Sequence, residues 1–153
     1  MRSRSTWFTV HRWLGIGLGL WFALVGLTGA LLVFEEPLDA WLNPELLTTT
    51  ARGPHLSAQA IVERAEAAYP LGLVEKIRFP EAVGTVYRLT LRTKPRRVGA
   101  ERIEAMFDPV NGVQLGSRSL EALSLLPPDL LRTLYEFHRN VLLGNAGSNI
   151  VGI

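Results

Sequence analysis

The sequence predicts a membrane-anchored protein of the α+β class, and three stretches carry this prediction. Residues 13–34 are 22 consecutive positions without a charged side chain, as in a transmembrane helix. Over residues 56–120 the apolar residues first recur with the spacing of a helix and then alternate with polar residues, as in strands. This pattern predicts one helix on a small antiparallel sheet of about four strands. A helical period returns over residues 121–144 and leads into an apolar run, residues 145–153, that resembles the start of an incomplete second span.

The first apolar run is long enough to cross a bilayer. At about 1.5 Å per residue it covers roughly 33 Å, against a hydrocarbon core of about 30 Å. A cleaved signal peptide is the alternative, but its apolar region usually has about 7 to 15 residues. No small-x-small cleavage site precedes the acidic flank either. We therefore expect residues 13–34 to remain as a transmembrane helix in contact with membrane lipid.

The charges on either side of the run predict its orientation. The charged residues before the run are all basic, whereas those that follow it are acidic. Positively charged flanks of a span stay in the cytoplasm. Residues 1–12 are therefore expected in the cytoplasm, residues 35–55 as an extracytoplasmic linker, and Trp41 at the membrane interface. The flanking charges are Arg2, Arg4 and Arg12 before the run, and Glu35, Glu36, Asp39 and Glu45 after it.

The soluble domain is expected at residues 56–120. Ser57 is placed to cap a helix that Pro70 and Gly72 end. Three half-buried strands should follow, and the segment 108–112 has the Asp-Pro and Asn-Gly chemistry of a tight turn before a fourth strand. The alternating apolar residues are Ile77, Phe79, Tyr87, Leu89, Leu91, Ile103, Ala105 and Phe107, with Val113 to Leu115 as the fourth strand.

An amphipathic helix is predicted after the domain. Asp129 is placed to cap it behind two prolines, and its apolar stripe ends at Gly144. Charged residues rule out a lipid-exposed span here, so we expect the helix to lie along the outer surface of the membrane. The stripe is Leu131, Leu134, Tyr135, His138 and Leu142, and the charged residues are Arg132, Glu136 and Arg139.

Composition excludes several classes of function. The chain has no cysteine, which excludes disulfides, thiolate metal sites and covalent haem attachment through C-x-x-C-H. The net charge is only +2, and no polybasic face indicates a nucleic-acid partner. The basic stretch 93–102 is either a solvated hairpin loop or a contact for anionic lipid or an acidic ligand. With three histidines and no H-E-x-x-H motif, hydrolytic catalysis has no support.

Two histidines are candidate ligands of haem iron, because a neutral imidazole can serve as an axial ligand. His11 precedes the span and His138 lies on the apolar stripe of the later helix, whereas His55 lies in a loop. The alternatives are an interfacial role for His11 and a packing role for His138. The two histidines should be separated by about the thickness of the hydrocarbon core of the bilayer. Each would therefore bind a different haem and need a second ligand from elsewhere. The glycines of the span serve either ordinary helix packing or the approach of a flat cofactor.

The sequence resembles the PepSY-associated transmembrane proteins over nearly its whole length. The resemblance is carried by His11-Arg12-Trp13-Leu14-Gly15, Gly26 through Phe34, Trp41-Leu42-Asn43-Pro44, the stretch from Ile103 to Leu115, Phe137-His138-Arg139 and Ile150 through Ile153. It implies a PepSY-like domain at residues 56–120 and the bacterial inner membrane as location. Typical members have about four spans, and some are ferric-siderophore reductases with b-type haems.

By that resemblance His11 and His138 are the haem b ligands, and the chain is the amino-terminal part of a protein that passes electrons to ferric siderophores or other ferric chelates. Further helices would come from the same chain or from a partner, and this part alone would be inactive. The alternative is a membrane-anchored module that binds or inhibits an extracytoplasmic protein, such as a peptidase, without redox chemistry. A third possibility is that the domain merely links two spans.

Overall fold

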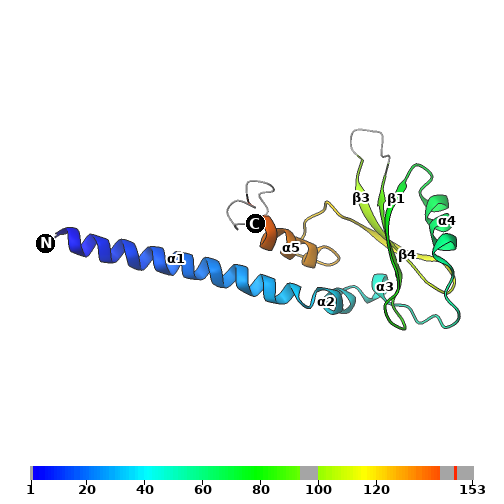
Figure 1. The fold of residues 1–153 in the computed structure, drawn as a ribbon, viewed down its shortest axis with the longest axis horizontal. Coiled ribbons are helices and arrows are strands. Elements are labelled where there is room, and N and C mark those ends of the chain that lie inside the picture. The colour runs from blue at the N-terminus through cyan, green and yellow to red at the C-terminus, as the bar shows by residue number, and fades with distance from the viewer. Residues whose placement is uncertain (1, 94–99, 142–146, 148–153) are drawn as a thin grey trace. The chain divides into compact units, whose positions relative to one another are not determined.

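The computed structural model describes residues 2–93, 100–141 and 147, with the backbone alone for residues 2 and 3. It contains two compact units, one made of residues 1–35 and 133–153 and the other of residues 36–132. The elements other than β2 are labelled in Figure 1. In chain order they are α1 (Arg2–Leu32), α2 (Glu35–Leu42), α3 (Pro44–Leu47), α4 (Ala58–Ala68), β1 (Leu73–Arg78), β2 (Tyr87–Arg92), β3 (Arg102–Phe107), β4 (Gln114–Ser119) and α5 (Leu130–Asn140).

The first unit is built on α1, a helix of 31 residues. Among the described residues, its segment Arg4–Leu32 is the one stretch that is long and apolar enough to cross a membrane. The helix starts eleven residues before the predicted span and ends two residues before the predicted limit. At about 1.5 Å per residue it measures roughly 46 Å, so it exceeds the hydrocarbon thickness of about 30 Å.

The last turn of α5 packs against α1 within the same unit. The Phe137 ring meets the Trp21 ring edge-on with 6.3 Å between centroids, and His138 contacts residues 25 and 28. Trp21 lies within the apolar run, so the last turn of this helix contacts the predicted span. Its place along the outer surface of the membrane stays a prediction. Leu142, the stop at Gly144 and the expected second span at 145–153, apart from Gly147, lie outside the described residues.

The second unit contains one antiparallel sheet with the strand order β1-β2-β3-β4. The α+β class and the four strands are therefore confirmed. The turn from β3 to β4 is also as predicted: Asp108 Oδ1 accepts hydrogen bonds from the amides of Val110 and Asn111 at 2.8 and 3.1 Å. Gly112 has a φ of 69°, a conformation that glycine adopts without steric cost.

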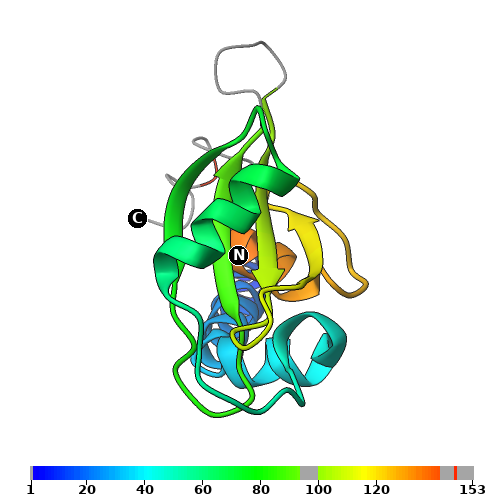
Figure 2. The same cartoon turned by 90° about the vertical axis from the view of Figure 1, so that its right-hand side faces the viewer.

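One face of the sheet packs on α4, as the alternation predicts. Ser57 caps this helix, and its side-chain oxygen accepts a hydrogen bond from the amide of Ala60 at 3.2 Å. The helix lies across the sheet in Figure 2 and buries Ile61 and Ala65 completely. Residues from β2 and β3 complete this core, namely Tyr87, Leu89, Leu91, Ile103, Ala105 and Phe107. Apolar burial of this kind is the main driving force of folding.

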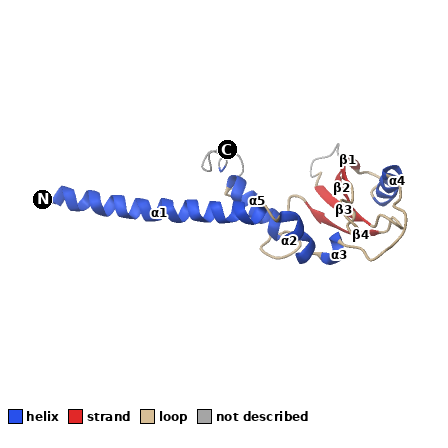
Figure 3. Ribbon diagram, turned by 60° about the horizontal axis from the view of Figure 1, so that its bottom comes forward, coloured by secondary structure: helices blue, strands red, loops and turns tan. Residues whose placement is uncertain are grey.

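The opposite face is covered as well, by the helices α2 and α3 (Figure 3). Leu47 of α3 packs with Val86 and Met106, and Met106 is fully buried. The expected linker at residues 35–55 thus contains two helices that belong to the sheet domain. Five consecutive residues of β3, from Ile103 to Phe107, are buried, so the prediction of a strand with one solvated face is wrong for β3.

Candidate functional site

His138 is held by two polar groups on one turn of α1. Its Nδ1 atom lies 3.1 Å from the carbonyl oxygen of Val25 and 3.3 Å from Oγ1 of Thr28. The Thr28 hydroxyl donates its own proton to the same Val25 carbonyl at 2.8 Å. Thr28 is buried and His138 is half-buried. Three groups from segments more than a hundred residues apart in the sequence therefore form one small polar cluster on an apolar helix.

Gly29 makes room for the imidazole ring. A Cβ atom at this position would lie 2.8 Å from Cε1 and 3.3 Å from Nε2 of His138, which is closer than carbon and ring atoms normally approach. A Cβ on Gly15, Gly17, Gly19 or Gly26 would meet nothing within 4 Å. Of the glycines in α1, Gly29 is thus the one whose missing side chain accommodates a group that the structure describes.

These contacts determine which ring nitrogen carries the proton. A carbonyl oxygen can only accept, so Nδ1 must be the donor in its contact with Val25. In the neutral ring this leaves the lone pair on Nε2. Histidines that bind a metal almost always donate their other N–H to a backbone carbonyl or carboxylate, which fixes the ring for coordination. The surroundings of His138 therefore fit an axial ligand of haem iron.

His11 has different surroundings. It is exposed on a face of α1 that also carries Arg4, Trp7 and Phe8. Seventeen residues separate it from Thr28 along one helix, or about 25 Å at 1.5 Å per residue. The two candidate histidines are therefore far apart, as expected. Within residues 2–93, 100–141 and 147, no group of three or more His, Cys, Asp or Glu side chains could enclose a metal ion.

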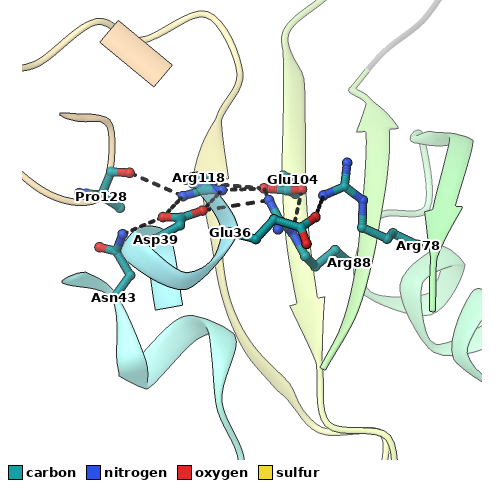
Figure 4. A network of polar contacts seen from close by, with 8 residues as sticks. All are labelled: Glu36, Asp39, Asn43, Arg78, Arg88, Glu104, Arg118 and Pro128. Carbon is teal, nitrogen blue, oxygen red and sulfur yellow. Dashed lines mark hydrogen bonds and ion pairs between the residues drawn. The ribbon is translucent and has the colours of Figure 1, made fainter. Parts of the chain in front are cut away.

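A second polar cluster lies in the sheet domain, where charged side chains are buried on the α2 face of the sheet (Figure 4). Arg118 of β4 is at its centre. Its guanidinium group binds both carboxylate oxygens of Asp39 in α2, at 2.7 and 2.9 Å, and Oε2 of Glu104 in β3 at 2.8 Å. It also donates to the carbonyl oxygen of Pro128 at 3.2 Å. Arg88 of β2 completes the cluster with a 2.9 Å bond to Glu104.

The charges of this ion cluster, Asp39, Arg88, Glu104 and Arg118, balance one another. Burial alone would raise the pKa of Glu104, but the hydrogen bonds and positive charges of Arg88 and Arg118 outweigh it and leave the pKa below its ordinary value of 4.5. Burial likewise opposes the charged form of Arg118, yet its two acidic partners raise the pKa. Glu104 and Arg118 are thus held in their charged forms by their partners, which suits a cluster that holds α2 on the sheet.

A pocket of about 90 Å³ opens beside this cluster, between α2 and the turn from β1 to β2. Glu36 and Arg78 form an exposed ion pair of 3.0 Å at its rim. Their charges neutralise each other, and Arg88 in its wall is already bound to Glu104. The pocket therefore has no unpaired charge among these three residues with which to attract a ligand.

The sequence pattern indicates His138 but not its partners, and it does not indicate the ion cluster. Thr28 beside Gly29 was a possible signal, since a hydroxyl within an apolar span needs an acceptor. For the cluster the signal was weaker, because Arg88 and Glu104 alternate with apolar residues in their strands and Arg118 stands between two serines. For all three positions, contact with solvent was the simpler expectation. Arg102, at the end of the predicted basic stretch, pairs with Glu75 at 2.9 Å, whereas residues 94–99 lie outside the described part of the chain.

The comparisons with known proteins agree with the resemblance. A family model described as the PepSY-associated TM region matches residues 8–153. A comparison with curated proteins found no match. The family match and the long apolar helix together indicate a membrane protein. Because the match covers all but the first seven residues, the chain belongs to the family of proteins with a PepSY-associated transmembrane region.

Proposed function

We propose that this chain is the amino-terminal part of a b-type haem protein of the bacterial inner membrane, which passes electrons across the bilayer to ferric siderophores or other ferric chelates. The observation that supports this proposal best is the contact of His138 Nδ1 with the Val25 carbonyl at 3.1 Å. In the neutral ring it leaves the lone pair on Nε2, on a helix that packs against the long apolar helix. The resemblance of His11 and His138 to the membrane-end histidines of the family supports the same function.

Each residue of the His138 site has a separate role in this proposal. The Val25 carbonyl accepts a hydrogen bond from Nδ1 and fixes the tautomer, and the Thr28 hydroxyl donates a hydrogen bond to the same carbonyl. Gly29 provides the space for the ring. A bound haem would supply an iron that alternates between the ferric and ferrous states and so carries one electron at a time. The further axial ligands would come from other helices, in the same protein or in a partner chain.

His11 would serve a second haem near the opposite end of α1. The basic residues of the amino terminus favour the cytoplasmic side for this end, by the positive-inside rule, and so the extracytoplasmic side for His138. The separation of about 25 Å along α1 excludes a single haem between the two rings. Two haems at different depths would provide a path through a layer that electrons do not cross unaided.

The experiment is a reduced-minus-oxidised absorption spectrum of the intact protein purified from membranes. We expect a b-type spectrum that is diminished in His138→Ala and in His11→Ala and retained in His55→Ala, which removes a histidine of an exposed loop. Intact protein without haem would overturn the proposal. A spectrum unchanged in both variants would leave haem binding standing but would remove these two ligands from it.

A paired substitution in α1 tests the His138 site without removing the ligand. Gly29→Ala would push a methyl group into the ring, whereas Gly26→Ala adds the same methyl group where nothing lies within 4 Å. We expect Gly29→Ala to lower the haem content or shift the reduction potential and Gly26→Ala to do neither. The same haem content and reduction potential in the two variants would mean that the His138 ring does not pack on Gly29 in the haem-bound protein.

The alternative of a module that binds an extracytoplasmic protein through its sheet is less well supported. Both faces of the sheet are covered, by α4 on one side and by α2 and α3 on the other. Co-purification of a stoichiometric protein partner with the full chain, together with the absence of haem, would favour this alternative over the redox proposal.

A further inference from the structure

We propose that one end of the sheet domain docks on the membrane surface, where Trp41, Leu125 and Leu126 insert among the lipid headgroups and the upper acyl chains. These three residues are the docking residues. They lie in α2 and in the segment 122–128, which precedes α5. The partner is the lipid of the bilayer in which α1 is anchored.

The docking residues are large apolar side chains that are mostly exposed. Trp41 is 76% exposed, Leu125 is 75% exposed and Leu126 is 71% exposed. On α2 the buried Asp39 faces the sheet, and a helical residue two positions further along points to the opposite side. Trp41 therefore points away from the domain. The segment 122–128 contains no charged residue, so it can approach an apolar phase without burying an ion.

The ion cluster holds the two segments at the same end of the domain. Arg118 binds Asp39 in α2 and, through the same guanidinium group, the carbonyl oxygen of Pro128, as Figure 4 shows. Trp41 is two residues from the first contact, and Leu126 is two residues from the second. Because one side chain binds both segments, the two segments that carry the docking residues are held at the same end of the domain.

Chain connectivity identifies lipid as the partner. The apolar helix and the sheet domain are joined twice, and both connections run through these segments. Trp41 follows the last residue of α1 by nine positions, and Leu126 precedes His138, which contacts the span at Val25 and Thr28, by twelve. Both segments are therefore close to the bilayer along the chain. Tryptophan favours the interface between water and lipid, and leucine enters the boundary between headgroups and acyl chains.

The absence of cysteine from the chain allows a direct test. Single cysteines replace Trp41, Leu125 or Leu126 in the full chain, each is labelled with a nitroxide, and the protein is reconstituted in phosphatidylcholine nanodiscs. Electron paramagnetic resonance then compares collisions with oxygen, which concentrates in lipid, and with a water-soluble nickel chelate. Leu71→Cys is the matched control: Leu71 is 67% exposed and lies just before β1, at the edge of the sheet opposite β4.

We expect labels at the docking residues to show a several-fold higher ratio of oxygen to chelate collisions than the label at Leu71. Labels at Leu125 and Leu126 that are as open to the chelate as the control would overturn the proposal. So would labels shielded from both reagents, which would indicate that protein covers the surface. Circular dichroism checks that each variant is folded, and exposed positions are chosen so that folding does not depend on the side chains replaced.

Discussion

The two faces of the sheet are stabilised in different ways. The face towards α4 is a continuous apolar core in which Ile61, Ala65 and Leu89 are completely buried. The face towards α2 combines a small apolar cluster around Met106 with the buried ions centred on Arg118. Apolar contact is non-directional, whereas an ion pair that has lost its water needs correct geometry at every atom. The α4 face thus provides cohesion, and the α2 face fixes one particular arrangement of α2 on the sheet.

The largest expected effect comes from removing the centre of the ion cluster. Arg118→Met would leave Asp39 without its bidentate partner in a buried position, which typically costs about 3–5 kcal/mol. Urea unfolding of the full chain in detergent, combined with hydrogen exchange of the β3 and β4 amides, measures this loss. Arg92→Met is the control, because its pair with Glu75 is half exposed and should contribute about 1 kcal/mol or less. Similar losses of unfolding free energy in the two variants would contradict the role of the ion cluster in holding α2 on the sheet.

A substitution on the other face tests the apolar core. Leu89→Ala should destabilise the domain by about 2–5 kcal/mol, because it removes completely buried methyl groups and leaves a cavity. The same measurements apply, and the loss should be independent of pH. The exposed Leu71→Ala provides the baseline, with an expected change within about 0.5 kcal/mol. A pH-dependent loss in Leu89→Ala would mean that the two faces are not energetically separate.

Acidification should weaken the α2 face selectively. Burial raises the pKa of Glu104, but Arg88 and Arg118 bring it below the ordinary value of 4.5. A carboxyl group whose pKa is lower in the folded than in the unfolded state stabilises the fold at pH values above its unfolded pKa. This stabilisation is lost as the pH falls from about 4.5 through the folded pKa. Glu104→Gln should cost about 1.5–3 kcal/mol at neutral pH. Its unfolding free energy should then fall less steeply below that pH than that of the unchanged chain.

This comparison of acid dependence isolates Glu104. Asp108 also has a lowered pKa: burial raises it, but the hydrogen bonds from Thr49, Asn111 and Val110 outweigh burial. Because both proteins retain Asp108, its contribution cancels. Identical acid slopes in the two proteins would show that Glu104 does not titrate with unfolding.

The smallest effect is expected at the rim of the same face. Arg78→Ala removes the pair with Glu36, in which both side chains are well exposed, and such pairs contribute about 0–1 kcal/mol. Any loss should disappear at high salt, since exposed charges are screened. A large loss that persists in salt would place Arg78 within the ion cluster and not at its edge.

The parts of the fold that the sequence predicted are those that local patterns determine. The apolar run, the cap at Ser57 and the turn after β3 each depend on residues close together in the chain. The ion cluster could not be predicted in this way, because Asp39 and Arg118 are separated by 79 positions and a strand charge normally faces water. His138 was a candidate from its place on the apolar stripe, but its contact with Val25 spans 113 positions. Pairing over such distances depends on the assembled fold.

The clamped position of α2 limits how far the sheet domain can travel. If residues 35–55 were an extended linker, a tether of 21 residues at about 3.3 Å each would allow excursions of roughly 70 Å from the span. Since α2 begins at Glu35 and is bound to the sheet through Asp39, the joint after α1 consists of Val33 and Phe34, about 7 Å of chain. Along this connection only two residues separate the apolar helix from the helix that is bound to the sheet.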